Sequence, residues 1–354
     1  MKRIFRLSFL LLFSVEMHAQ PSAYQIKEMD IELQGLYRKG KFNGAVLIAQ
    51  NGSPIYKKVF GVANAKTNEA LKFNSSFNLA SVSKQFFAMM IMQLKETGKL
   101  DYDDKLTQYF PEFPSKKITI RHLLNHTSGL PEYFDLAEQY IGEDEIMTNK
   151  KLLSMLSANK SKLSFEPGTK WEYCNTGYAL LVNIIEKTSK MPIEDYFKTK
   201  ISAPLGLRDS YVFYKNMKNN TSAGHQRVYG FEVKNGKKYL NDLTNMDGVV
   251  GDGNIYSSIE DLLKWDQALY TTKLVSAATL KEAFTSGKLS NGEEFGYGFG
   301  WGIEENNKKI SHTGSWVGFE SFISRNMKSK TTVIILSSST NDTAIDLVNE
   351  ILEK

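Results

Sequence analysis

The 354-residue sequence contains one cysteine, Cys174. A single cysteine cannot form an intramolecular disulfide or a cysteine-rich zinc or iron–sulfur site. Its position also excludes a lipoprotein signal, which needs a cysteine at the cleavage point. No histidine or basic residue adjoins Cys174 to activate it, so we expect a small buried side chain and not a nucleophile.

Long apolar runs are also scarce. Residues 7–15 (LSFLLLFSV) form a short run, far below the roughly 20 residues that span a bilayer. The basic residues before it are Lys2, Arg3 and Arg6. With Ala19 as a small residue for cleavage, residues 1–19 are typical of a secretory signal peptide. The alternative is that this segment stays uncleaved as an N-terminal anchor. Met17, at the third position before the cleavage point, is larger than the small residue that cleavage requires there. No later stretch predicts a membrane span, so we expect a periplasmic or extracellular protein.

Strong charge of one sign is absent as well. The chain has 44 Lys+Arg and 39 Asp+Glu, a net charge of +5. Residues 1–19 hold three of the basic residues and one acidic residue, so the remainder has 41 against 38 and a net charge of +3. That balance is too small and too evenly spread to indicate a nucleic-acid partner.

Several functional motifs are missing. The chain has no G-x-S-x-G, which excludes the nucleophile-elbow hydrolases, and its glycine pairs lack the strand–loop–helix context of nucleotide binding. His122 and His126 have the spacing of a zinc pair, but the zinc-protease motif needs Glu after the first His, where this chain has Leu123. We therefore expect neither a metal nor an organic cofactor.

Strand patterns occur at the two ends of the chain and helix patterns between them. Helical spacing covers residues 22–41, 82–99, 120–125, 150–157, 177–189, 193–201, 258–270 and 343–353. Strand patterns cover residues 42–50, 55–62, 296–303, 309–312, 318–325 and 331–337. We predict an α/β (α+β) fold in which residues 20–75 and 290–354 build one antiparallel sheet with terminal helices. Residues 76–289 form a mainly helical insertion, with the active site at the seam.

Ser81-Val82-Ser83-Lys84 begins an apolar predicted helix. A serine hydroxyl is a weak nucleophile until a base takes its proton, and residues three apart share a helix face. Apolar neighbours favour the neutral, proton-accepting amine of Lys84, and a helix N-terminus stabilises developing negative charge. The spacing alone is weak evidence, because Ser157 and Lys160 repeat it in a polar context that we interpret as surface.

Two further clusters gain meaning only in combination. Tyr173 and Asn175 are two residues apart, so in an extended segment they face the same way, with Tyr173 placed to relay a proton and Asn175 to contact substrate or Lys84. His312-Thr313-Gly314-Ser315 lies at the end of a predicted strand, where glycine lets backbone N–H groups approach a substrate. Each cluster alone is equally typical of an ordinary loop.

The order and context of the three clusters resemble the serine β-lactamase and penicillin-binding-protein superfamily, whose motifs are S-x-x-K, Y-x-N and K-T-G or H-T-G. The resemblance is greatest to the branch that contains class C β-lactamases, D-Ala-D-Ala carboxypeptidases, D-aminopeptidases and related carboxylesterases. It extends over most of the chain. Supporting segments are residues 77–80, 120–131, 165–175 and 251–265.

The resemblance implies a β-lactamase/transpeptidase-like fold and a role for each motif residue. Ser81 would be the acylated nucleophile, Lys84 and Tyr173 would transfer protons, and Asn175 would position substrate. The backbone N–H groups of Ser81 and Ser315 would form the oxyanion hole, and the segment His312-Thr313-Gly314 would line the opposite wall. Histidine here titrates near pH 6.5, so its attraction for a substrate carboxylate is weaker than that of lysine.

The resulting prediction is an exported serine hydrolase that acts on amide, ester or lactam carbonyls through an acyl-enzyme. D-Ala-containing cell-wall peptides are the leading substrates, esters the second and β-lactams the third. A rival of another class is a binding protein that is acylated or occupied by peptidoglycan-like ligands without turnover. We expect a monomer whose partner is a small-molecule or peptide substrate, with a pocket shaped by residues 132–150 and 214–248.

Overall fold

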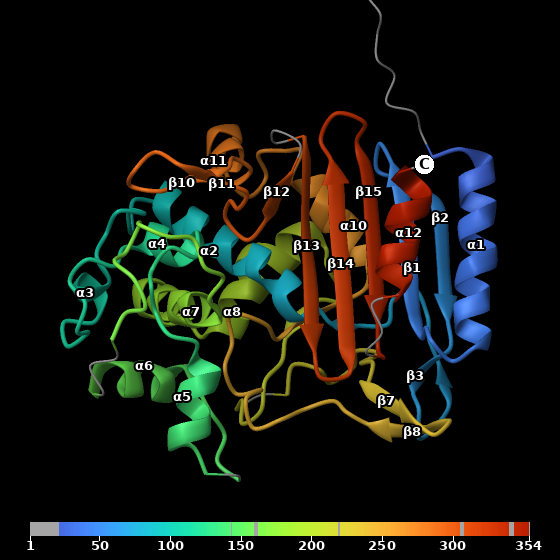
Figure 1. Cartoon of the computed structure of the whole chain (residues 1–354), viewed down its shortest axis with the longest axis horizontal. Helices are drawn as coiled ribbons and strands as arrows, with labels where there is room; N and C mark the ends of the chain where they lie inside the picture. Colours follow the sequence, from blue (N-terminus) through green and yellow to red (C-terminus); the bar gives the residue numbers. More distant parts are fainter. Residues whose placement is uncertain are drawn as a thin grey trace, which may run out of the picture.

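The computed structural model describes residues 21–142, 144–158, 162–218, 220–304, 308–339 and 343–353. The predicted signal, residues 1–19, and Lys160 lie outside these ranges. A six-stranded antiparallel sheet dominates one side of the molecule, with strand order β12-β13-β14-β15-β1-β2 (Figure 1). Its strands are β12 (Gly302–Glu304), β13 (Lys309–Trp316), β14 (Phe319–Asn326), β15 (Thr331–Ser337), β1 (Gly44–Gln50) and β2 (Ser53–Phe60).

The two ends of the chain meet in this sheet. β1 pairs with β15 from Gly44 opposite Ser337 to Gln50 opposite Thr331. β1 and β2 form a hairpin whose turn residues, Asn51 and Gly52, both have positive φ, which matches the right-handed twist of the paired strands.

Alternate residues of the central strands enter different cores. Val46 and Ile48 pack under α1 (Ala23–Arg38) and α12 (Thr343–Glu353), while Leu47 and Ala49 belong to a larger core that includes α2 (Lys84–Glu96) and α10 (Ile259–Ala268). The sheet is therefore covered on both faces, and Figure 1 shows α12 drawn over β1 and α1 at the outer side of β2. The large core joins the sheet to the helical region.

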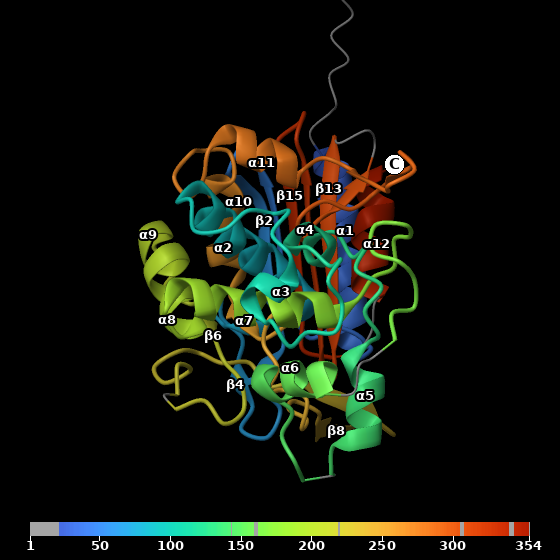
Figure 2. The ribbon, with the colours of Figure 1, turned by 90° about the vertical axis from the view of Figure 1, so that its left-hand side faces the viewer.

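The helical region lies at the β12 side of the sheet, and Figure 2 shows α3, α4, α6 and α7 in front of it. Its helices are α3 (Leu106–Tyr109), α4 (Ile120–Leu124), α5 (Tyr133–Tyr140), α6 (Asn149–Ala158), α7 (Asn175–Ser189), α8 (Ile193–Phe197), α9 (Ala203–Leu205) and α11 (Ala277–Ala283). α7 packs against α2, α4 and α6. Within the described ranges, no helix combines the length and apolar character needed to cross a membrane.

Short strands complete the structure. β5 (Phe77–Asn78), β9 (Ile255–Ser257) and β6 (Tyr211–Val212) form a small sheet, and the pairs are β3 (Val62–Asn64) with β4 (Glu69–Ala70), β7 (Phe231–Lys234) with β8 (Lys237–Leu240), and β10 (Gly287–Lys288) with β11 (Glu294–Phe295). β5 immediately precedes the Ser81 segment, so the small sheet fixes the approach to that residue.

The predicted fold class is confirmed: helices are combined with an antiparallel sheet that is flanked by N- and C-terminal helices. The predicted strand over residues 296–303 is wrong, because only its last two residues enter β12. Gly300 has φ +77°, and a Cβ there would lie 2.9 Å from the backbone of Lys84 and Gln85. Gly300 thus allows close packing against the start of α2, while Gly298 allows a close approach to the Ala283 carbonyl oxygen. β13 also extends beyond the predicted end at His312, to Trp316.

Candidate active site

Ser81 lies in a strained turn that leads into α2. The turn is a 3₁₀ helix, Ala80–Ser83, and Ala80 has φ +45°, which is unusual for a residue with a Cβ. Asn78 Oδ1 accepts the Ala80 N–H at 2.9 Å, and Ser321 Oγ donates to the Leu79 carbonyl at 2.6 Å. Contacts from β5 and β14 therefore hold the turn in its strained conformation. Strained backbone that is fixed by its surroundings in this way is concentrated at functional sites.

The Lys84 side chain is fully buried at the beginning of α2. Its Nζ lies 3.0 Å from Ser81 Oγ, 2.8 Å from Asn175 Oδ1 and 2.9 Å from the Asp252 carbonyl oxygen. The amide and carbonyl oxygens only accept hydrogen bonds. A neutral Lys84 would donate to those two atoms and direct its lone pair at the Ser81 hydroxyl, the arrangement that a general base requires.

Asn175 begins α7, and Glu132 determines its orientation. The Glu132 carboxylate accepts from Asn175 Nδ2 at 2.9 Å, from the Asn175 N–H and from the Thr176 N–H at 3.4 Å. With Nδ2 committed to Glu132, Oδ1 faces Lys84. Our sequence reasoning missed Glu132, although it directly follows the segment 120–131 that the resemblance had marked.

The Tyr173 ring faces the lysine, but its hydroxyl does not contact it. Lys84 Nζ lies 4.9 Å from the ring centroid, and the His126 ring packs against Tyr173 in a tilted arrangement, with 4.2 Å between ring centroids. The hydroxyl oxygen is buried and forms no hydrogen bond with any described residue. Cys174 points elsewhere: its Sγ donates to the Leu130 carbonyl at 3.3 Å, and burial raises the pKa of the thiol to about 12, as for a structural cysteine.

His312 is buried and its two ring nitrogens both have partners. Nδ1 lies 2.5 Å from the Thr313 carbonyl oxygen, which only accepts, so Nδ1 carries the proton and Nε2 accepts from the Tyr297 hydroxyl at 2.9 Å. Burial, followed by the charge of Lys84, lowers the pKa of His312 to about 4. Our expectation of titration near pH 6.5 was therefore wrong, because the sequence does not show this burial. The neighbouring Thr313 side chain is exposed.

Gly314 lets β13 pass directly beside the serine. A Cβ on Gly314 would lie 2.5 Å from the Leu79 carbonyl oxygen, 2.4 Å from Ser321 Oγ and 3.0 Å from the Ser81 backbone nitrogen. Any larger residue would push the strand away. Ser315 follows and lines the same cavity as Ser81, so the backbones of both serines border one space.

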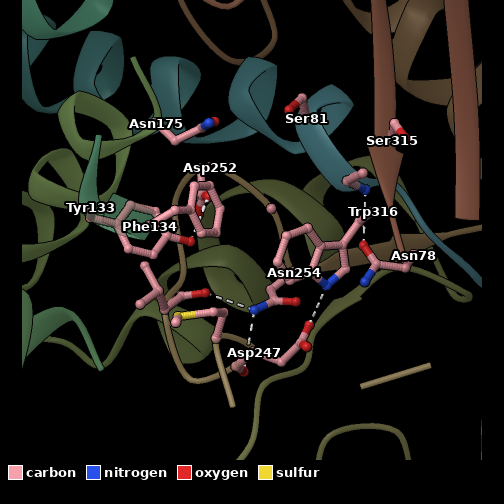
Figure 3. A pocket seen from close by; sticks show the side chains of 14 residues that line it. Asn78, Ser81, Tyr133, Phe134, Asn175, Asp247, Asp252, Asn254, Ser315 and Trp316 are labelled. Carbon is pink, nitrogen blue, oxygen red and sulfur yellow. Dashed lines mark hydrogen bonds between the residues drawn. The ribbon is translucent and has the colours of Figure 1, made fainter. Parts of the chain in front are cut away.

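The cavity beside Ser81 has a volume of about 190 Å³ (Figure 3). The predicted pocket loops both contribute to it, through Tyr133 and Phe134 from one and Met246 and Asp247 from the other. The other lining residues are Asn78, Ala80, Ser81, Asn175, Val249, Asp252, Gly253, Asn254, Ser315 and Trp316. The cavity thus joins the first and second motifs to β13.

The Beta-lactamase family model matches residues 30–353 of this chain. The chain belongs to the beta-lactamase family. Its relatives include "Penicillin-binding protein 4*" from Bacillus subtilis, which is 37% identical over 90% of this chain and 72% of that protein. A D-aminopeptidase from Brucella anthropi is 25% identical over 78% of this chain but only 52% of its own length. With the family established, the chain is a serine hydrolase.

Two solved structures share the fold of this chain. An octameric penicillin-binding protein homologue from Pyrococcus abyssi has a TM-score of 0.79 and 26% identity, covering 93% of this chain and 78% of that chain. The D-amino acid amidase of Ochrobactrum anthropi has a TM-score of 0.73 and 22% identity, covering 92% and 98%, and it supports the fold alone.

The two histidines that resembled a zinc pair have other contacts in this beta-lactamase family member. His122 Nδ1 accepts from the Thr119 N–H as part of a helix cap, and His126 Nδ1 accepts from the Cys174 N–H. Burial lowers the pKa of His126 far below its ordinary value. Among the described residues, no three His, Cys, Asp or Glu side chains gather as metal ligands.

Proposed function

We propose that this protein is an exported serine hydrolase that forms an acyl-enzyme at Ser81. D-Ala-type cell-wall peptides are its leading substrates, followed by esters and then β-lactams. The observation that carries the proposal is the 3.0 Å contact between Lys84 Nζ and Ser81 Oγ, with the other two Lys84 contacts made to obligate acceptors. The relatives named penicillin-binding protein and D-aminopeptidase support the substrate class.

In acylation, Lys84 takes the proton of the Ser81 hydroxyl while Oγ bonds to the substrate carbonyl carbon. The carbonyl oxygen becomes an oxyanion, and the backbone N–H groups of Ser81 and Ser315 stabilise it. The bond from carbon to the leaving nitrogen or oxygen then breaks. The leaving atom receives the proton that Lys84 holds, and Tyr173 serves as the adjacent relay.

In deacylation, a water molecule attacks the acyl-serine carbonyl. The water proton passes through the Tyr173 hydroxyl to Lys84, and the ester bond to Ser81 breaks as Oγ regains a proton. The Tyr173 hydroxyl is buried, has no hydrogen-bond partner among the described residues and does not contact Lys84, so the relay requires the ring to bring this hydroxyl to the water and the lysine.

A substrate panel tests the proposal: a D-Ala-D-Ala peptide, D-alanine derivatives, p-nitrophenyl esters and a chromogenic cephalosporin, scored by turnover. We expect multiple turnovers of at least one compound by the wild type and loss of turnover in Ser81→Ala. Stoichiometric binding with no turnover of any member would instead indicate the non-hydrolytic binding protein.

Export is tested by fractionating cells that express the full chain. The signal pattern of residues 1–19 predicts a protein outside the cytoplasm whose N-terminus is Gln20. Full-length protein retained in the cytoplasm would contradict this part of the proposal.

A further inference from the structure

The described lining of the cavity offers no free cation for a substrate carboxylate. Lys84 Nζ already uses its N–H groups and lone pair on Ser81, Asn175 and Asp252. His312 is buried and neutral. Arg227, which donates to Tyr256 near Asn78, forms an ion pair with Asp242 at 2.7 Å. A substrate group in this cavity therefore meets no positive charge that is available to bind it.

Three carboxylates lie around the site, and Asp252 accepts the fewest hydrogen bonds from described residues. Glu132 uses both oxygens on the N-terminus of α7. Asp247 uses Oδ2 on Thr244 and Oδ1 on the Trp316 Nε1–H, at 2.8 Å. Asp252 accepts from the Tyr133 hydroxyl at 2.9 Å and from its own N–H, and it forms no ion pair with a described lysine or arginine. A carboxylate has about four acceptor positions, so Asp252, which lines the cavity, retains about two unused ones.

Asp252 also lies next to the nucleophile. Its backbone oxygen and Ser81 Oγ both contact the same atom, Lys84 Nζ, at 2.9 and 3.0 Å. The walls around its carboxylate are aromatic: Tyr133 and Phe134 pack at 4.2 Å between ring centroids, and Phe134 stacks on Trp316 at 5.6 Å. Figure 3 shows these side chains on either side of the cavity. Aromatic faces with a carboxylate form a favourable environment for an organic cation.

We propose that this cavity is a subsite for a primary ammonium group, and that Asp252 is its counter-ion. The inference rests on the proposed function and names the substrate class: amides, peptides or esters whose acyl residue carries a free α-amino group. In such a substrate the nitrogen is two bonds from the carbonyl carbon that Ser81 attacks. The ammonium group is therefore held beside the reacting bond, and the acyl transfer itself is unchanged.

Matched substrates test the subsite. D-alanine p-nitroanilide and N-acetyl-D-alanine p-nitroanilide share a leaving group and differ in the charge of the amine, and both enantiomers are assayed. We expect the free amine to be preferred at least about tenfold in kcat/KM, the effect of one good charge-assisted contact. Asp252→Asn keeps an acceptor for Tyr133 and should abolish the preference, mainly by raising KM for the free amine relative to the acetylated anilide. Glu353→Gln, on α12 across the sheet, is the control that should retain it.

A second measurement needs no variant. Hydrolysis of p-nitrophenyl acetate by the wild type should be inhibited competitively by D-alaninol, a small amine, and not by D-lactate, a small carboxylate. Equal rates on the free and acetylated anilides, or stronger inhibition by the carboxylate, would overturn the ammonium subsite while Ser81-dependent ester turnover left the proposed function intact. Loss of all Ser81-dependent turnover would overturn both.

Discussion

Lys84 combines two features that rarely occur together in a lysine side chain: complete burial and three short polar contacts. Two of the partners can only accept hydrogen bonds, so Ser81 is the only one of the three that can give a proton to the amine. Glu132 strengthens this assignment, because it occupies the Asn175 Nδ2 group and leaves Oδ1 for the lysine. The base is thus oriented by a residue that contacts neither Ser81 nor Lys84.

Replacing Lys84 with methionine keeps the shape of the side chain and removes the proton acceptor. We expect kcat for ester hydrolysis to fall by about 10² to 10⁴, the usual contribution of a general base. Tyr173→Phe should lower kcat by a smaller factor in the same range. Steady-state kinetics provide the measurement, with Lys281→Met on the surface helix α11 as the control. A near-normal rate in either variant would remove that residue from the mechanism.

His312 predicts a specific pH dependence. Burial, followed by the charge of Lys84, lowers its pKa to about 4, and the ring lies against Tyr297 and Tyr173, so it stays neutral above pH 5. Because the folded pKa lies below the unfolded value of 6.5, the stability that His312 contributes is lost as the pH falls from about 6.5 to about 4. Between pH 5 and 9, the profile of kcat/KM for a neutral ester should have the same inflections in the wild type and in His312→Asn.

An inflection near pH 6.5 that is present in the wild type and absent from His312→Asn would contradict this account. The titration of Asp252 must be distinguished from that of His312. Burial raises the pKa of the Asp252 carboxyl to about 6, against the opposing effects of Lys84 and Tyr133. An inflection near 6 that persists in the histidine variant belongs to Asp252. One that disappears in Asp252→Asn confirms that origin.

The site residues that can be predicted from the sequence are those that lie close together in the chain, because local helix or strand geometry then fixes their relative positions. Ser81 and Lys84 are one helical turn apart, and Tyr173 and Asn175 lie on the two sides of Cys174, so local geometry brings each pair together. Glu132 and Asp252 lie in loops far from these motifs in sequence. Their contacts with Asn175 and Tyr133 exist only after α5, α7 and the residue 251–254 loop have packed, and no local pattern specifies them.

At the scale of elements, β13 depends on one glycine to reach the serine. In Gly314→Ala the new Cβ would overlap the Leu79 carbonyl oxygen and Ser321 Oγ, so β13 must shift away from the Ser81 turn. The loss of oxyanion-hole geometry should lower kcat by at least about 10², the effect of losing one such donor. Kinetics with an ester and circular dichroism together separate this effect from unfolding.

Gly35 provides the matched control for that substitution. It lies inside α1, and nothing is within 4 Å of an added Cβ. Gly35→Ala should leave kcat unchanged and stabilise the protein by roughly 0.5 to 1 kcal/mol, because alanine has the higher helix propensity. Wild-type kcat in Gly314→Ala would show that β13 does not form part of the catalytic site.

The elements predicted best are those whose apolar pattern follows directly from how they are buried. The sequence predicted β15 and α12 with the bounds that the structure has, because β15 is an almost continuous buried run and α12 buries one apolar face. It missed α5, a helix of eight residues whose packing depends on contacts with Asp252 and Trp316. It mistook residues 296–303 for a strand, because the aromatic–glycine alternation resembles a strand pattern, whereas the glycines allow close approaches to other backbone segments, Gly300 to the start of α2 among them.

At the scale of the whole molecule, the sheet connects the ends of the chain and supports the site. β1 and β15 pair along their full length, and β13 and β14, on the other side of β15, contact the Ser81 turn. The site therefore requires the first strand, the middle helices and the last strands at once. The antiparallel sheet with its helical insertion follows from the distribution of strand and helix patterns along the sequence, but the cavity arises from loops whose path those patterns do not determine.

The central claim, an acyl-enzyme at Ser81, is tested most directly by intact-mass spectrometry. After incubation with a fluorophosphonate, and separately with a penicillin, the account predicts one adduct per chain, located on the peptide that contains Ser81. Ser81→Ala should form none, whereas Ser157→Ala, at the other Ser-x-x-Lys sequence in the chain, should be labelled like the wild type. An adduct that persists in Ser81→Ala, or is lost in Ser157→Ala, would contradict the account.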